Sequence, residues 1–201
     1  MSAGRAAPAA GALVALALLN VAAWGSPALL EALRWTPAAA GQPWRYLSAH
    51  LVHLTPLHWA GNMAGLAVVA VFLRSVFGPH LPSWRWALGG ALALGVSLHA
   101  TSLGSYAGLS AWLHGAVAFA AIGLLAGAAG RRRLVGAAVL AGLLVKCLLE
   151  RPWVPVADDA FYDMPVAVVA HALGCALGIA GGLVYRLRRG AGTPAATDAG
   201  G

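Results

Sequence analysis

The sequence MPVAVVAHALGCALGIAGGLVY (residues 164–185) contains no aspartate, glutamate, lysine or arginine. At about 1.5 Å per residue, a helix of this length crosses the hydrocarbon core of a bilayer, which is about 30 Å thick. Its single histidine, His171, lies among small and apolar residues. Ionisable groups are costly inside a membrane and therefore indicate function by default. The segment predicts a membrane-spanning helix that carries a reactive group.

The rest of the chain has a similar composition. Hydrophobic residues make up 60% of the 201 residues and charged residues 9%, whereas soluble domains have roughly half and a quarter. We predict an all-α, polytopic membrane protein, with one domain over residues 1–189 and a disordered cytoplasmic tail over 190–201. The six predicted spans are residues 9–30, 56–78, 84–103, 108–129, 134–149 and 164–185. No convincing cleavage site follows the first apolar stretch, so we expect it to be retained rather than removed as a signal peptide.

The charged residues fall mainly between the predicted spans, and the formal net charge of the chain is +7. In an alternating six-span arrangement the basic residues gather on one side, which the positive-inside rule assigns to the cytoplasm together with both termini. These residues are Arg5, Arg74, Arg85, Arg131, Arg132, Arg133, Arg186, Arg188 and Arg189. No basic stripe is interleaved with aromatic residues, so we expect the lipid bilayer, and no nucleic acid, as a partner.

The fourth predicted span begins with a glycine and a serine, Gly108 and Ser110. Glycine permits a tight turn, and the serine then lies at or near a helix N-terminus. Free backbone N–H groups and the positive end of the helix dipole stabilise a negatively charged oxygen at such a position. Taken alone, however, a Gly-x-Ser sequence is more often a helix cap than a catalytic site.

The second predicted span begins at Thr55 and Pro56, which favour an N-cap and a first helical residue. His58 and Asn62 then lie one turn apart on the same face, with Cβ atoms about 5–6 Å from each other. Two side-chain donors can therefore point at one place. Together with the backbone N–H of Ser110, we expect them to bind an oxyanion.

The sixth predicted span places His171 about 10 Å from its outer end, as counted from residue 164. Gly174 and Gly178 follow on the same face and form a seam of small residues, which allows another helix to approach closely. We expect His171 to meet Ser110 below the outer surface. The imidazole can then take the serine proton, and the serine oxygen can attack a peptide carbonyl.

These motifs resemble, in order, those of the rhomboid proteases. They are Trp44-Arg45, His53, His58-x-x-x-Asn62, Gly108-Leu109-Ser110 and Ala170-His171-x-x-Gly174-x-x-x-Gly178. The resemblance implies a six-helix bundle that cleaves transmembrane substrates with a serine–histidine dyad, with no third acidic member and no cofactor or metal. No acid lies within the second, fourth and sixth predicted spans, which agrees with a dyad.

Two segments resemble more narrowly the rhombosortases, which are short bacterial rhomboids. They are Gly108-Leu109-Ser110-x-x-Leu113-His114-Gly115 and Ala49-His50-Leu51-Val52-His53-Leu54. This resemblance implies substrates with a C-terminal GlyGly-CTERM signal, namely a glycine-rich motif, one transmembrane helix and a basic cluster. It also implies a bacterial inner membrane and an active site that opens to the periplasm.

The sequence departs from most rhomboids at two positions beside the expected nucleophile. Ala111 replaces the glycine that usually follows the serine. We expect the added methyl group to narrow the site or to slow the reaction. His114 stands where most rhomboids carry a tyrosine, and we expect it to pack against His171.

Four alternative functions differ from this interpretation. A general rhomboid protease cleaves other single-span substrates, and a catalytically silent rhomboid-like protein only binds membrane helices. A bis-histidine haem protein needs facing histidine pairs, whereas His58 and His171 both lie towards the outer side. A transporter typically shows internal repeats and broken helices, and neither is visible in the sequence.

The two cysteines, Cys147 and Cys175, form no disulfide framework or metal motif.

Overall fold

The computed structural model describes residues 6–159 and 164–191. The long helices are α1 (Ala6–Gly25), α4 (Pro56–Phe77), α5 (Trp84–Ser97), α6 (Ser110–Gly127), α7 (Gly130–Leu149) and α8 (Val168–Ala191). The short elements are α2 (Pro27–Leu33), η2 (Pro37–Gly41), α3 (Arg45–Ser48), η3 (Leu98–Ala100), β1 (Ala157–Asp159) and β2 (Met164–Val166). Most of the predicted tail, from residue 192 onwards, lies outside the described residues.

Helices α4, α6 and α8 are long and apolar enough to cross a membrane, and they are the three such helices in the described part of the chain. A shorter apolar helical segment covers Gly11–Gly25 in α1. Large apolar side chains are exposed on the outer faces of several helices, for example Val71, Leu134 and Leu187. Such extensive apolar exposure fits a surface that lies against lipid rather than water. The count of six spans remains a prediction.

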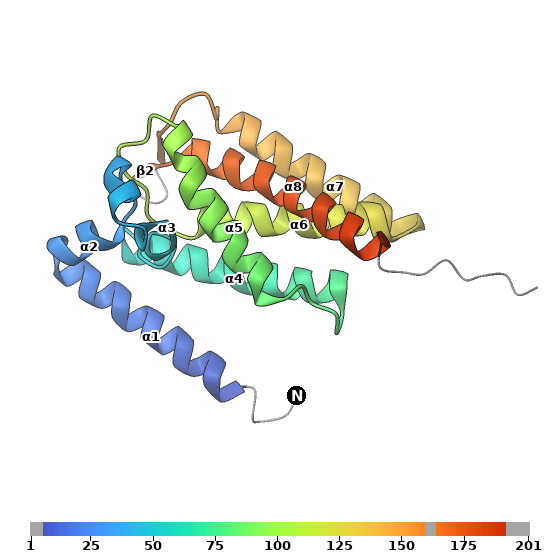
Figure 1. The fold of residues 1–201 in the computed structure, drawn as a ribbon, viewed down its shortest axis with the longest axis horizontal. Helices are drawn as coiled ribbons and strands as arrows, with labels where there is room; N and C mark the ends of the chain where they lie inside the picture. The colour runs from blue at the N-terminus through green and yellow to red at the C-terminus, as the bar shows by residue number, and fades with distance from the viewer. Residues whose placement is uncertain (1–5, 160–163, 192–201) are drawn as a thin grey trace, which may run out of the picture.

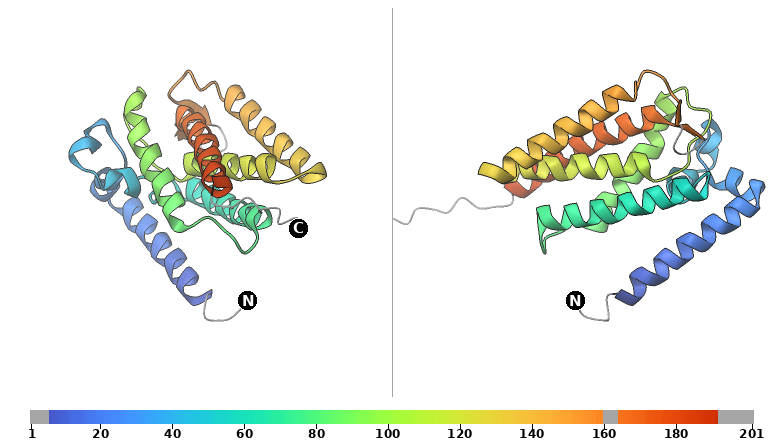
Figure 2. Two further views of the ribbon diagram at one scale, coloured as in Figure 1. Left: turned by 45° about the vertical axis from the view of Figure 1, so that its right-hand side comes forward. Right: turned by 180° about the vertical axis from the view of Figure 1, so that it is seen from behind.

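Helix α6 lies at the centre of the bundle and packs against α4, α7 and α8, with its most extensive contact against α8. Helix α1 lies at the edge, on the side of α4 away from α8 (Figures 1 and 2). The central position of α6 places its N-terminal residue, Ser110, within reach of three neighbouring helices.

Helices α6 and α8 meet along a seam of small residues. A Cβ atom built on Gly174 lies 1.9 Å from the carbonyl oxygen of Ala111, which is itself fully buried. A Cβ atom on Gly178 lies 2.0 Å from the carbonyl oxygen of Gly115. The two backbones therefore approach more closely than any side chain permits at these positions. This contact brings His171, one turn before Gly174, next to the start of α6.

Three predicted spans differ clearly from the helices that the structure contains. The predicted span 84–103 is α-helical only as far as Ser97, where α5 ends, and residues 98–100 form η3. The predicted span 9–30 breaks at Ser26, whose hydroxyl oxygen accepts a hydrogen bond from the backbone N–H of Leu29 and so caps α2. The predicted span 164–185 begins with a strand, because residues 164–166 pair in antiparallel fashion with residues 157–159.

Helix α8 consequently begins at Val168, and His171 is its fourth residue. The prediction that His171 lies about 10 Å along its helix is therefore wrong, since the distance is closer to about 4.5 Å. Pro165 contributes to this difference because it disfavours helical backbone at the residue before it. At the other end, α8 extends to Ala191, two residues into the predicted tail.

The segment between α1 and α4 is held by buried polar side chains. Arg45 is buried and donates to two backbone carbonyls at the end of α2 and just beyond it. Asn20, fully buried in α1, accepts a hydrogen bond from His53 Nδ1 at 3.1 Å. The backbone N–H of Gly108 donates to the carbonyl of Ala49 at 2.8 Å. This segment therefore supports the turn that leads into α6.

Candidate active site

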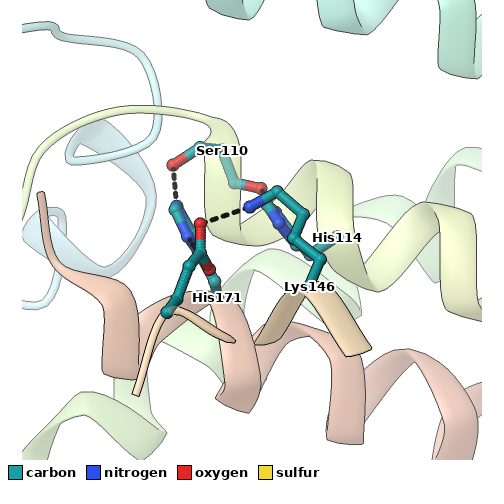
Figure 3. A network of polar contacts seen from close by, with 5 residues as sticks. Ser110, His114, Lys146 and His171 are labelled. Carbon is teal, nitrogen blue, oxygen red and sulfur yellow. Dashed lines mark hydrogen bonds and ion pairs between the residues drawn. The ribbon is translucent and has the colours of Figure 1, made fainter. Parts of the chain in front are cut away.

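Ser110 and His171 are brought together by the close crossing of α6 and α8. The distance between Ser110 Oγ and His171 Nε2 is 2.9 Å, which is an ordinary hydrogen bond (Figure 3). His171 is buried and Ser110 is half-buried. A hydroxyl that faces an imidazole nitrogen at this distance can transfer its proton to that nitrogen.

The turn before Ser110 requires glycine at position 108. Gly108 has φ of +116°, and a Cβ atom there would lie 2.5 Å from Cε1 of His58. The hydroxyl of Tyr106 donates to the carbonyl oxygen of Gly108 at 2.6 Å, and Tyr106 itself forms a β-bridge with Trp35. These contacts hold the turn so that Ser110 is the first residue of α6, where helix N–H groups are free to bind an anion.

His58 and Asn62 lie in the first turns of α4, as their spacing predicts, because Thr55 caps this helix. Both side chains border the space beside Gly108. The Cβ position at 108 lies 2.7 Å from His58 Nε2 and 3.4 Å from Asn62 Nδ2. Asn62 is buried, and its Nδ2 atom has no hydrogen-bond partner among the described residues. A buried amide donor in this state is available to an incoming oxygen atom.

A carboxylate contacts the other nitrogen of the His171 ring. Glu150 follows the last residue of α7, and its Oε2 atom lies 3.0 Å from His171 Nδ1. Its second oxygen pairs with Lys146, one turn earlier in α7 (Figure 3). Burial by itself raises the pKa of Glu150, but hydrogen bonds from His171 and Lys146 lower this pKa to about 2. The carboxylate is therefore ionised at neutral pH.

The expectation that no acid accompanies the serine and histidine is thus wrong. The expectation was based on the absence of acidic residues inside the second, fourth and sixth predicted spans. Glu150, however, lies at the end of the fifth predicted span. The available signal was the pair Lys146 and Glu150 at i, i+4 spacing, which places opposite charges on one helix face at the predicted outer end of that span.

His114 lies in α6 one turn after Ser110 and contacts both Ser110 and His171. Its Nδ1 atom donates to the carbonyl oxygen of Ser110 at 2.7 Å. Its ring is stacked on that of His171, with 4.2 Å between centroids and 10° between planes. The structure therefore places His114 in the position expected for it from the sequence.

His114, Glu150 and His171 have potential metal-ligand atoms within 4.8 Å of one another. Imidazole lone pairs lie in the plane of the ring, so two parallel stacked rings do not direct them at one point. Both nitrogens of His171 are also hydrogen-bonded, to Ser110 and to Glu150. The arrangement fits a hydrogen-bonded chain better than a metal site.

The serine hydroxyl contacts one ring nitrogen of the histidine, and a carboxylate contacts the other ring nitrogen. Together with a nearby amide donor, this arrangement is typical of serine hydrolases. This site lies at one end of a bundle of apolar helices. The Rhomboid domain family model matches residues 40–188, which include every residue of the site. The chain belongs to the rhomboid family, whose members are membrane-embedded serine proteases that act on transmembrane substrates. No curated protein matches the chain.

Proposed function

We propose that this protein is an active intramembrane serine endopeptidase in which Ser110 is the nucleophile and His171 the general base. The observation that carries the proposal is the 2.9 Å contact between Ser110 Oγ and His171 Nε2. A silent rhomboid-like protein that only binds helices has no need for this contact. The alanine at position 111, which departs from the usual glycine, would favour a silent protein if it disturbed the site. Ala111 lies buried against Gly174, however, and it does not separate the serine from the histidine.

The reaction begins when His171 Nε2 accepts the proton of the Ser110 hydroxyl. Ser110 Oγ then bonds to the carbon of the scissile carbonyl, and the π electrons of that carbonyl move to its oxygen. Collapse of this intermediate breaks the C–N bond, and His171 returns the proton to the leaving amine. A water molecule repeats the sequence on the acyl-enzyme, which releases the carboxylate product and regenerates the serine.

The oxyanion formed in this step is bound, in our proposal, by Asn62, His58 and the backbone N–H of Ser110. Support comes from the space beside Gly108, which His58 Nε2 and Asn62 Nδ2 both border. A preorganised donor in a site shielded from water stabilises developing charge more strongly than a donor in water. Gly108 leaves the space open because it has no side chain.

Replacing Asn62 with alanine is expected to lower kcat by about 10- to 1,000-fold, with a smaller change in KM. The reason is that the amide donates to an oxygen that becomes negative only during the reaction. Steady-state cleavage by purified protein measures both constants. Asn62→Asp serves as a control of similar shape, because a carboxylate cannot donate and should be at least as inactive. Unchanged kcat in Asn62→Ala would show that this amide has only a structural role.

We further propose a bacterial inner-membrane location with six spans, cytoplasmic termini and an active site that opens to the periplasm. The charge distribution supports this orientation. The α6–α7 turn, the start of α7 with its Arg131–Arg132–Arg133 run, and the C-terminal half of α8 lie at the end of the bundle opposite to the site (Figure 1). Basic residues at span ends favour the cytoplasmic side.

Topology reporters fused after Arg133 and after Gly201 are expected to behave as cytoplasmic. A reporter inserted near Asp158 is expected to behave as periplasmic, because the β1–β2 hairpin lies at the end of the bundle that carries the site. Paired phosphatase and fluorescent-protein fusions distinguish the two sides. A periplasmic signal from the fusion after Gly201 would contradict the six-span arrangement.

For the substrate, we propose a C-terminal transmembrane sorting signal of the GlyGly-CTERM type, cut near its periplasmic end. Backbone inside a helix is shielded by its own hydrogen bonds, so the substrate must unwind to reach Ser110. Each glycine lowers helix stability by about 1 kcal/mol relative to alanine and removes a side chain that obstructs entry. The basic cluster that follows the helix then remains in the cytoplasm.

Co-expression with a GlyGly-CTERM reporter tests this function. We expect processing by the wild-type protein, sharply reduced processing when both reporter glycines are replaced by leucine, and none by Ser110→Ala. Electrophoretic mobility of the reporter is the measurement. Equal processing of both reporters and of an unrelated single-span protein would indicate a general rhomboid protease. No processing of any of them would favour a silent helix-binding protein.

A further inference from the structure

The carboxylate of Glu150 lies on the side of the His171 ring opposite to Ser110. Oxygen Oε2 is 3.0 Å from Nδ1, and Nε2 is 2.9 Å from the serine Oγ. An ionised carboxylate only accepts hydrogen bonds, so the hydrogen of a neutral His171 ring is on Nδ1. Nε2 then keeps its lone pair, which faces the serine hydroxyl. The position of Glu150 therefore selects the tautomer that a general base requires.

Several features of α7 hold Glu150 at this place. Its backbone N–H donates to the carbonyl of Lys146 at 3.0 Å, and the two side chains form an ion pair. The next residue, Arg151, has φ of +57°, so the chain leaves the helical conformation directly after Glu150, which is the C-cap residue of α7. A non-glycine residue in this left-handed conformation costs about 1 kcal/mol or more, and such strain is found preferentially at functional sites.

We propose that Glu150 is a positioning residue that completes a Ser110–His171–Glu150 triad, a role that rests on the protease function proposed above. The carboxylate keeps the ring in the reactive tautomer before proton transfer. After transfer it stabilises the positively charged imidazolium, and this attraction is strong where the surroundings have a low dielectric constant. Lys146 provides the counter-charge that keeps the half-buried carboxylate ionised when the ring is neutral.

The decisive variant is Glu150→Gln, which retains the shape of the side chain. Its amide can donate to Nδ1 and so move the ring hydrogen to Nε2, where it faces the serine. We expect kcat to fall by about 100- to 10,000-fold while KM changes little. The rate at which a fluorophosphonate probe labels Ser110 should fall in parallel. Glu150→Asp retains the charge on a shorter side chain and is expected to recover part of the activity.

Glu31→Gln is the matched control, because Glu31 also forms an ion pair with a residue of its own segment, Arg34. Its side chain is not among the hydrogen-bond and ion-pair partners of His171 in the described part of the chain. This variant is expected to show wild-type kcat. Thermal unfolding of all variants separates loss of chemistry from loss of folding. A merely structural role would give a different result. Glu150→Asp would then be as inactive as Glu150→Gln, and the unfolding midpoints of both variants would be equally lowered. This outcome would overturn the proposal.

A spectroscopic measurement reports the tautomer without relying on turnover. In protein with ¹⁵N-labelled histidine, NMR is expected to find the His171 hydrogen on Nδ1 in the wild type and on Nε2 in Glu150→Gln. The same tautomer in both proteins would overturn the proposal. So would loss of wild-type activity in the presence of a chelator, since that would indicate a metal ligand at Glu150.

The outcomes distinguish the two proposals. If the probe labels Ser110 in the wild type and Glu150→Gln is labelled and active within about twofold of it, only the triad fails. If the wild type neither cleaves the reporter nor reacts with the probe, the protease function fails, and the triad fails with it.

Discussion

Alanine at Ser110 or at His171 is expected to lower kcat by about a million-fold, the scale measured when a hydrolytic serine or its histidine is removed. Neither group can be replaced by a neighbour, because His171 Nε2 is the atom bonded to Ser110 Oγ in the structure. The double variant should be no less active than either single variant, since the two residues act as one unit. Cleavage of the glycine-containing reporter and labelling by a fluorophosphonate probe are the measurements.

Ser105→Ala, in the loop before α6, is the control for this experiment and is expected to be labelled and active like the wild type. Unfolding midpoints should change little in Ser110→Ala, because the residue is only half-buried and the substitution removes a single oxygen atom. Labelling of His171→Ala at the wild-type rate would mean that another group activates the serine, and would contradict the assignment of the base.

The second large effect is expected from Gly174, where α8 rests on α6. The Cβ atom of an alanine at this position would lie 1.9 Å from the backbone carbonyl oxygen of Ala111, and backbone cannot move aside as a flexible side chain can. The helices must therefore separate, which moves His171 away from Ser110. A displacement of about 1 Å in a catalytic pair costs about 100-fold in rate. We expect at least this loss in Gly174→Ala, and no stably folded protein in Gly174→Val.

Gly142→Ala in α7 is the matched control, because nothing lies within 4 Å of a Cβ atom built there. This substitution should be neutral or slightly stabilising, because alanine has a higher helix propensity than glycine. Thermal unfolding in detergent and the reporter assay measure both variants. A Gly174→Ala protein with wild-type stability and kcat would show that the small-residue seam does not control the distance between the serine and the histidine.

The sequence alone determined the features that depend on composition and on short spacings. Low charge and long apolar stretches are sufficient to indicate membrane helices. Residues three, four and seven apart share a helix face, so the pairing of His58 with Asn62 and of His171 with the glycine seam follows from their numbers. The tight turn at Gly108 was similarly predicted from a glycine just before a helix start, and the structure has a positive φ there.

Other features were decided only by the tertiary structure. The first is the start of α8, because residues 164–166 are apolar enough for a helix but pair with residues 157–159 instead. The second is the triad geometry, because Glu150 and His171 are 21 residues apart and belong to different helices. Helical periodicity relates side chains within one helix. Which helix ends meet depends on how α7 and α8 pack around α6, and that packing follows from contacts between residues distant in the chain.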